Sequence, residues 1–91
     1  MKRDIVWTTQ FKKDYKLVQK RGQDIDLLDN CIRALALGEE LESKFCDHNR
    51  TGKWTGHREC HVLPDWLLVY RIENNDLVLV LARTGSHSDL F

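Results

Sequence analysis

The sequence predicts an α+β fold in which a two-helix hairpin packs on one face of a small, mostly antiparallel sheet. Two observations predict it: apolar side chains recur at helical spacing in residues 11–35, and the period changes to two in residues 57–84. A chain of 91 residues suits a single domain, spanning residues 1–91. The expected element order is β-α-α-β-β-β, followed by a short tail at residues 85–91.

The chain opens with a strand and a helix. Asp4–Trp7 is a short apolar segment with two β-branched residues, which favours a strand. Residues 11–20 then place apolar side chains at i, i+4 and i+7, on one face of a helix. Thr8 or Thr9 supplies a capping hydroxyl at its start, and Gly22 suits its end.

A second helix and a loop follow. Asp24 can cap a helix whose apolar side chains in residues 25–35 form one stripe, and Gly38 closes it. Only a few residues join the two helices, so they should form an antiparallel hairpin. From Glu39 to Gly56 the periodicity is lost, which indicates a connecting loop.

Three strands complete the sheet. His57–Val62, Trp66–Ile72 and Leu77–Thr84 show strand character, and the last two flank the turn-forming segment Glu73–Asp76. Pro64 separates the first two of these strands. The sheet face away from the helices, with the loops at its edge, is where function is expected.

Charge and composition exclude several classes of protein. Fourteen basic residues balance fourteen acidic ones, which argues against a free-standing nucleic-acid binder. However, residues 1–22 carry a net charge of +5 and residues 23–43 carry −5. The basic segment can attract phosphate, or the two helices can simply attract each other. No membrane span or signal peptide is expected, and three cysteines without paired spacing suggest reduced thiols in the cytoplasm.

Chemistry-bearing residues gather in the second half of the chain. Strand alternation places His57, Glu59 and His61 on one face of their strand. Of these, His61 can converge with Asp65, Arg83 and His87 at one end of the sheet, with His48 supplied by the loop. Such a set offers imidazoles for proton transfer, a carboxylate to orient them and a guanidinium for phosphate, which suits RNA cleavage through the ribose 2′-hydroxyl. No cofactor is implied, and the cysteine and histidine spacings fit a zinc site poorly.

Each of these residues also has an ordinary structural explanation. Asp65 beside Pro64 suits a turn, and Arg83 can pair with a carboxylate such as Glu59. Tryptophans are more often buried than used for stacking on bases. His57 is expected to be an exposed strand residue without a role.

Short motifs in a fixed order along the chain indicate a protein family more specifically than the residue composition does. They read D-H, G-x-W, R-x-x-H-V-x-P-D-W and R-T-G-[ST]-H, and they begin at Asp47, Gly52, Arg58 and Arg83. With the lysine-rich segment at residues 11–16, the whole chain resembles the YafQ-type branch of the RelE/ParE toxin superfamily. This resemblance implies a RelE-like, microbial-RNase-type fold, in agreement with the element order above.

The resemblance also implies a function. Such a toxin is an endoribonuclease, or mRNA interferase, that cuts messenger RNA on the ribosome and is silenced by a cognate antitoxin, through which alone it would contact DNA. Residue by residue, it implies catalytic positions at His48, His61, Asp65, Arg83 and His87, and aromatic substrate-placing positions at Trp66 and Phe91. The basic first helix is expected to dock on ribosomal RNA through Lys12, Lys13 and Lys16.

Some roles stay open at this point. His87 or Asp65 is the candidate base, His48 or His61 the candidate acid, and Arg83 the phosphate ligand. A slightly longer hairpin around residues 74–75 departs from the family and should leave the site intact. The alternative function is that of a ParE-like toxin that binds a protein target such as gyrase without cutting RNA.

Overall fold

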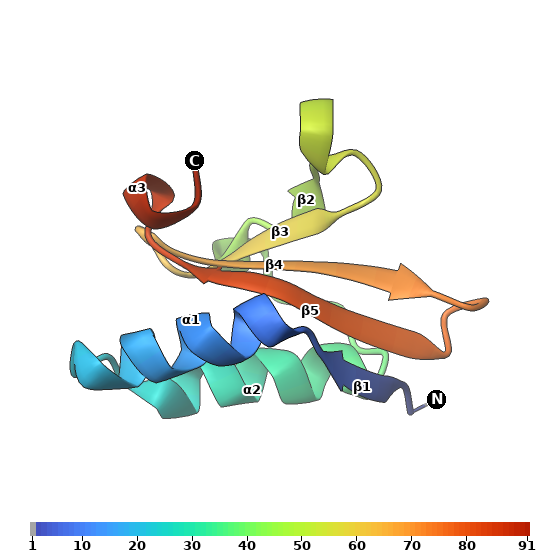
Figure 1. Ribbon diagram of the computed structural model, residues 1–91. Coiled ribbons are helices and arrows are strands. Elements are labelled where there is room, and N and C mark those ends of the chain that lie inside the picture. The colour runs from blue at the N-terminus through green and yellow to red at the C-terminus, as the bar shows by residue number, and fades with distance from the viewer. Residues whose placement is uncertain (1) are drawn as a thin grey trace.

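The computed structural model describes residues 2–91 and shows three layers (Figure 1). Helices α1 and α2 run antiparallel on one face of a five-stranded sheet, and the short helix α3 lies on the other face with the loop that carries β2. The elements are β1 (Asp4–Trp7), α1 (Thr9–Lys20), α2 (Ile25–Ala36), β2 (His48–Asn49), β3 (Arg58–Leu63), β4 (Trp66–Glu73), β5 (Val78–Gly85) and α3 (His87–Leu90), with 3₁₀ turns at Ser43–Phe45 and Gly52–Trp54.

The sheet has the strand order β1-β5-β4-β3-β2. The strand β1 pairs with β5 in parallel, whereas the other neighbours pair antiparallel. The predicted α+β class, the helix hairpin and the mostly antiparallel sheet are therefore confirmed.

The capping residues define where both long helices begin. The Thr8 side chain accepts a hydrogen bond from the Phe11 N–H at 3.1 Å, and the Asp24 carboxylate accepts one from the Asp26 N–H at 3.2 Å. These bonds satisfy amide groups that have no partner within a helix. No helix within residues 2–91 combines the length and the apolarity needed to span a bilayer.

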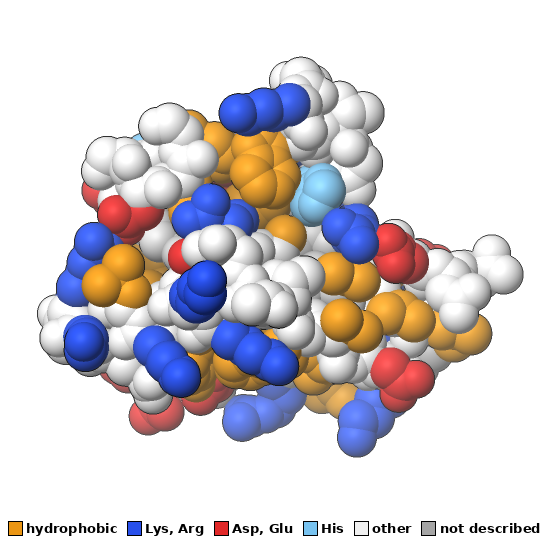
Figure 2. Space-filling model, in the orientation of Figure 1, with side chains coloured by type: hydrophobic (Ala, Val, Ile, Leu, Met, Phe, Trp, Pro, Cys, Tyr) orange, Lys and Arg blue, Asp and Glu red, His pale blue; other side chains and the backbone are white. Residues whose placement is uncertain are grey.

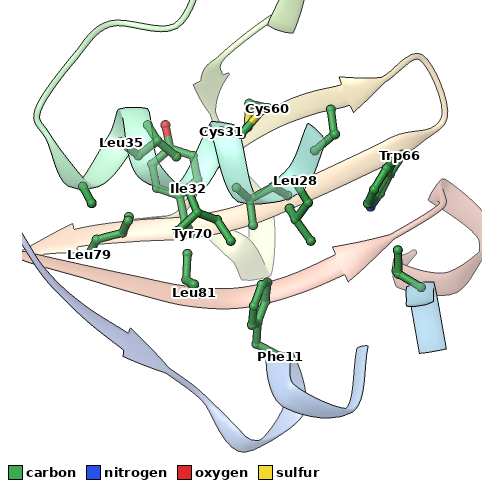
Figure 3. Close-up of a cluster of buried hydrophobic side chains, with 14 residues drawn as sticks. Phe11, Leu28, Cys31, Ile32, Leu35, Cys60, Trp66, Tyr70, Leu79 and Leu81 are labelled. Atoms are coloured by element: carbon green, nitrogen blue, oxygen red, sulfur yellow. The ribbon is translucent and has the colours of Figure 1, made fainter. Parts of the chain in front are cut away.

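The main core lies between the two long helices and the sheet (Figure 3). The helices contribute Phe11, Leu28 and Ile32, among others, and the strands contribute side chains that alternate toward them, such as Leu68 and Leu81. A smaller apolar cluster occupies the opposite face of the sheet, under α3: Leu67, Val69, Ala82 and Leu90, with Trp54 packed against it.

Two short elements depart from the sequence prediction. The expected loop contains β2, in which His48 pairs with Glu59 of β3. Two residues are too few to show a period, so this strand depends on its tertiary partner. The expected tail contains α3, which is fixed by a capping box: the Ser86 hydroxyl accepts from the Asp89 N–H, and the Asp89 carboxylate accepts from the Ser86 N–H.

The hairpin between β4 and β5 lies at the end of the sheet away from α3 (Figure 1). Asn74, Asn75 and Asp76 all adopt positive φ angles, of 58°, 57° and 69°. Asn and Asp tolerate this left-handed conformation better than other side chains except glycine. The hairpin prediction is confirmed.

Replacing Leu68 by alanine should lower the free energy of unfolding by about 2–5 kcal/mol, because the side chain is fully buried and its removal leaves a cavity. Urea denaturation monitored by circular dichroism measures the change. The matched control is Leu63→Ala at the end of β3, where the side chain is 41% exposed and the loss should be much smaller. Equal losses in the two variants would contradict this description of the core.

Candidate active site

The candidate site begins with the alternation of side chains along β3. Cys60 and Val62 point into the core against the helices. Their neighbours Glu59 and His61 therefore project from the opposite face of the sheet, as the period of two predicts.

Glu59 is the centre of this cluster. Its carboxylate is only 3% exposed, yet it faces three nitrogen-bearing side chains. One oxygen, Oε1, accepts a hydrogen bond from Arg50 Nη1 at 3.0 Å. The other, Oε2, lies 3.3 Å from His48 Nε2 and 3.5 Å from His61 Nε2. A buried carboxylate requires such partners, so Glu59 holds the two imidazoles on one side of the site.

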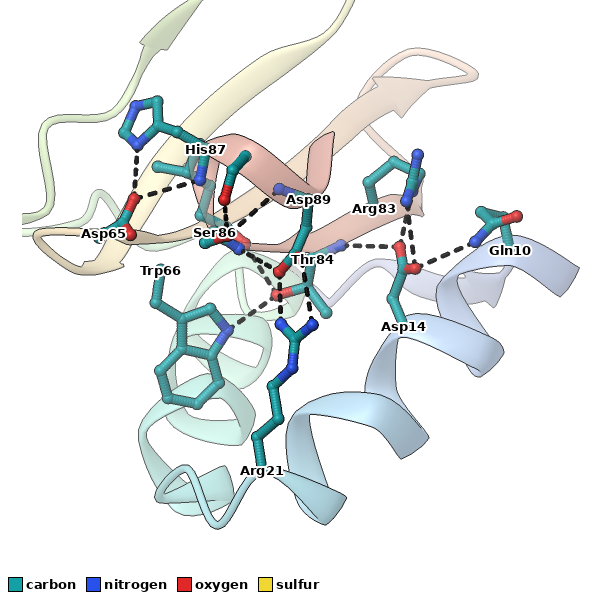
Figure 4. Close-up of polar contacts among 12 residues, drawn as sticks. Gln10, Asp14, Arg21, Asp65, Trp66, Arg83, Thr84, Ser86, His87 and Asp89 are labelled. Atoms are coloured by element: carbon teal, nitrogen blue, oxygen red, sulfur yellow. Dashed lines mark hydrogen bonds and ion pairs between the residues drawn. The ribbon is translucent and has the colours of Figure 1, made fainter. Parts of the chain in front are cut away.

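His87 and Asp65 extend the cluster along the sheet end. The His87 ring lies 5.8 Å from the His61 ring, centroid to centroid, and the His61 ring lies 6.3 Å from that of His48. Asp65 Oδ1 lies 2.9 Å from His87 Nδ1 and accepts the His87 backbone N–H at 3.1 Å (Figure 4). The hydrogen bond from the His87 side chain is the largest cause that lowers the pKa of Asp65.

The tail that carries His87 is held from the helix layer. Arg21, at the end of α1, donates to both carboxylate oxygens of Asp89, at 2.6 and 3.2 Å (Figure 4). These bonds lower the pKa of Asp89 to about 2. Gly85 precedes the tail with a φ of 153°, and a Cβ there would lie 3.0 Å from the Asp89 side chain. The glycine of the R-T-G-S-H motif is therefore needed for both conformation and space.

The loop that carries His48 is fixed by its neighbour Asp47. The Tyr70 hydroxyl donates to the Asp47 carboxylate at 2.8 Å, and Arg58 Nε donates to it at 3.1 Å. Burial and this carboxylate raise the pKa of Tyr70, which keeps the hydroxyl protonated as a donor. The ring of His48 is oriented by its Nδ1, which lies 2.6 Å from the Cys46 carbonyl oxygen.

Arg83 lies at the border of the site. Its guanidinium donates to the Asp14 carboxylate of α1, from Nε at 2.7 Å and from Nη2 at 3.3 Å, and Asp14 also accepts the Thr84 N–H at 3.2 Å (Figure 4). Arg83 faces the same side of the sheet as Val69, its partner across β4 and β5. The sequence-based alternative that Arg83 pairs with a carboxylate is confirmed, but the partner is Asp14 of α1 and not Glu59.

The two aromatic candidates have different positions. Trp66 is 2% exposed, and its indole N–H donates to the Thr84 hydroxyl at 3.0 Å. Its ring belongs to the core, so the expectation that a base stacks on Trp66 is corrected. Phe91 is 49% exposed, with the Arg50 guanidinium 4.1 Å from its ring centroid and Trp54 edge-on at 6.0 Å. Phe91 thus offers an accessible aromatic surface near the cluster.

An apolar groove of about 530 Å³ opens beside His61. Its lining includes the apolar side chains of Phe45, Leu63 and Pro64 and the basic side chain of Lys44. The groove has room for a planar, partly apolar group next to the imidazoles. Within residues 2–91, no three histidine, cysteine or acidic side chains are grouped in a way that would hold a metal ion.

The three candidate lysines are exposed on α1, in the helix layer. Figure 2 shows Lys and Arg side chains distributed over this helix in the viewed face. The basic surface and the histidine cluster therefore belong to different layers, α1 on one side of the sheet and the cluster on the other. These lysines are Lys12, Lys13 and Lys16.

Three residues of the site were not among the sequence-based candidates. Glu59 had a detectable signal, since the alternation of β3 already placed it beside His61. Arg50 and Asp14 had none, because their partners lie on elements that are distant in the sequence. By contrast, the structure brings together His48, His61, Asp65 and His87, and it places Arg83 at their border.

Comparison with known proteins agrees with this arrangement. The family model described as "Bacterial toxin of type II toxin-antitoxin system, YafQ" matches residues 3–91. The mRNA interferase toxin YafQ of Escherichia coli K12 is 39% identical over 92 residues, covering 100% of this chain and 98% of that protein.

Solved structures support the same relationship. YafQ from E. coli BL21(DE3) superposes with a TM-score of 0.92 at 39% identity, covering 98% of each chain. The E. coli DinJ–YafQ toxin–antitoxin complex contains a chain that matches with a TM-score of 0.90 at 39% identity, covering 100% of this chain and 99% of that one. The fold is thus the RelE-like one, and the chain belongs to the YafQ family of bacterial type II toxins.

Proposed function

We propose that this protein is an mRNA interferase that cleaves messenger RNA on the ribosome by attack of a ribose 2′-hydroxyl on the adjacent phosphate. The single observation that carries the proposal is the continuous row of His48, His61 and His87, held by Glu59 and Asp65. The activity named for the E. coli relative supports it. In this reaction the 2′-oxygen bonds to phosphorus and the 5′-oxygen departs, so one proton is removed and another is supplied.

His87 is suited to remove the proton. Its Nδ1 faces the Asp65 carboxylate, which only accepts, so Nδ1 carries the proton of the neutral ring. The lone pair is then on Nε2, the form required of a general base. The lowered pKa of Asp65 makes this carboxylate a weak base, which favours His87 over Asp65 for the role.

His48 or His61 is suited to supply the other proton. Each ring places Nδ1 near a backbone carbonyl oxygen, of Cys46 or Pro64, and Nε2 toward Glu59 Oε2. Both partners only accept, so a ring protonated on both nitrogens satisfies both contacts. That form is a general acid for the departing 5′-oxygen.

Arg83 supplies charge for the phosphate in this proposal. Asp14 engages its Nε and Nη2, which fixes the plane of the guanidinium and leaves N–H groups of Nη1 for a ligand. Such a cation stabilises the extra negative charge that develops on phosphorus oxygens in the transition state.

The proposed partners are a cognate antitoxin and a ribosome with bound message. The DinJ–YafQ structure supports the antitoxin as a partner, because it is a toxin–antitoxin complex of the related E. coli protein. The exposed lysines of α1 support docking on ribosomal RNA, and DNA would be contacted only through the antitoxin.

Replacing His87 or His61 by alanine should reduce cleavage of a translated message by about 100- to 10,000-fold, since each removes a proton-transfer group. Primer extension with purified protein, on ribosome-bound and on free RNA, measures the cut. His57→Ala is the matched control, since this imidazole packs edge-on against Trp54 at 5.2 Å, outside the row. Native rates in both site variants, or a wild-type protein that arrests growth without any cut, would favour the protein-binding alternative.

Arg83→Ala should lower the cleavage rate by about 100- to 1,000-fold, the usual cost of removing a group that stabilises transition-state charge. Single-turnover kinetics on ribosome-bound message provides the rate. Arg33→Ala, on the exposed face of α2, is the control and should keep the native rate. A rate for Arg83→Ala within twofold of the control would show that Arg83 only pairs with Asp14.

Reversing the charge of Lys12, Lys13 and Lys16 to glutamate should weaken ribosome association, with the fold retained because all three side chains are exposed. Sedimentation with ribosomes across a salt series measures the association, and the wild-type affinity should fall as salt rises. Unchanged binding of the triple variant at physiological salt would exclude this face as the docking surface.

A further inference from the structure

The side chain of Arg50 connects two parts of the site that are otherwise separate. On one side its Nη1 donates to Glu59 Oε1 at 3.0 Å, and on the other its guanidinium carbon lies 4.1 Å from the Phe91 ring centroid. Its backbone N–H donates to the His57 carbonyl oxygen at 2.8 Å, which fixes the base of the side chain. We propose that Arg50 is a positioning residue for RNA cleavage, which braces the Glu59 carboxylate and the Phe91 ring in one rigid unit.

The contact with Glu59 sets the carboxylate's orientation. A carboxylate at 3% exposure needs a compensating charge, and Arg50 is permanently protonated. Because Arg50 binds Oε1, the other oxygen stays turned toward His48 and His61. This inference rests on the proposed function, in which one of those two imidazoles is the general acid.

The contact with Phe91 sets the position of the aromatic surface. The planar guanidinium packs under the ring, while Trp54 contacts it edge-on at a centroid distance of 6.0 Å. The ring nevertheless remains 49% exposed, so a base can reach it. A ring held in place before the substrate binds loses less freedom on binding, which improves affinity.

The chemistry of arginine suits this double contact better than that of lysine. A guanidinium donates within its plane while its flat face stacks, whereas an ammonium is a point charge without a face. Arg50 Nε is also buried without a hydrogen-bond partner among residues 2–91. Arg50 therefore supplies in one side chain both the donor for Glu59 and the flat face for Phe91.

The experiment compares Arg50→Met, Arg50→Lys and the control Arg33→Met in steady-state cleavage of ribosome-bound message. Arg50→Met should lower kcat by about 10- to 100-fold and change the pH profile, because misplacing a reacting group by about 1 Å costs on the order of 100-fold. Arg50→Lys retains the charge beside Glu59, so it should restore most of kcat while KM stays raised. Arg33→Met should match the wild type in both constants.

A double-mutant cycle tests whether Arg50 acts through Glu59. In a Glu59→Gln background, Arg50→Met should cost less than about twofold in kcat, since two residues acting through one contact are not additive. A Phe91→Ala background should likewise abolish the effect of Arg50→Lys on KM. If the Arg50 substitutions have the same fold-effects in these two backgrounds as in the wild type, the proposed positioning role of Arg50 is wrong.

A loss of activity in an Arg50 variant can reflect a loss of folding, so the fold is measured separately. Thermal unfolding of each variant checks the fold. If Arg50→Met does not fold, the test uses Arg50→Lys alone. A wild-type KM for Arg50→Lys would overturn the inference. NMR adds a readout that needs no activity, since Phe91→Ala should move the Arg50 side-chain protons out of the ring's shielding. If the Arg50 variants match the wild type while His61→Ala is inactive, the positioning role of Arg50 is wrong and the proposed function stands. Native cleavage by His61→Ala would instead contradict the proposed function.

Discussion

The burial of a single carboxylate shapes the site of this protein. Glu59 projects from β3 on the face away from the long helices, yet its side chain is only 3% exposed. A charge in that position is tolerated only with close cationic or hydrogen-bonding partners. Arg50, His48 and His61 meet this need from the loop before β3 and from β3 itself, so the electrostatic requirement of one group assembles the others.

The part of the site formed by Arg83 and α3 depends on contacts with helix α1, across the sheet. Asp14 of α1 accepts from the side chain of Arg83 and from the Thr84 backbone, while Arg21 at the end of the same helix binds Asp89. The helix that carries the exposed lysines therefore also fixes the end of β5 and the start of α3. The position of α1 therefore affects two features at once. It sets where the exposed lysines lie, and it sets where the chain that carries His87 lies.

Much of the fold follows from local patterns in the sequence. The helices and the three long strands are periodic over enough residues to be predicted, and their caps and turn residues agree with the structure. The strand β2 is not predictable in this way, because two residues gain strand geometry only by pairing with β3. Helix α3 is equally short, although its capping pair Ser86 and Asp89 could have indicated it.

Site residues that belong to the sequence motifs could be predicted. Residues whose role depends on burial or on distant partners in the folded chain were harder to predict. The order of residues indicated the histidines and Asp65, and alternation placed Glu59 with His61. Trp66 shows the limit: its neighbours in the motif line the site, but its own side chain alternates into the core and bonds Thr84. Arg50 and Asp14 depend on partners that only the folded chain brings near them.

The clamp between Arg21 and Asp89 also bears on how the toxin would respond to acidity. A carboxylate with a pKa of about 2 contributes stability that is complete above its unfolded value, near 4, and is lost only as the pH falls through 2. Between about pH 4 and neutrality, the Asp89 carboxylate stays ionised in the folded protein, so the stability contributed by its pair with Arg21 is constant. Mild acidity therefore leaves the anchoring of α3 intact.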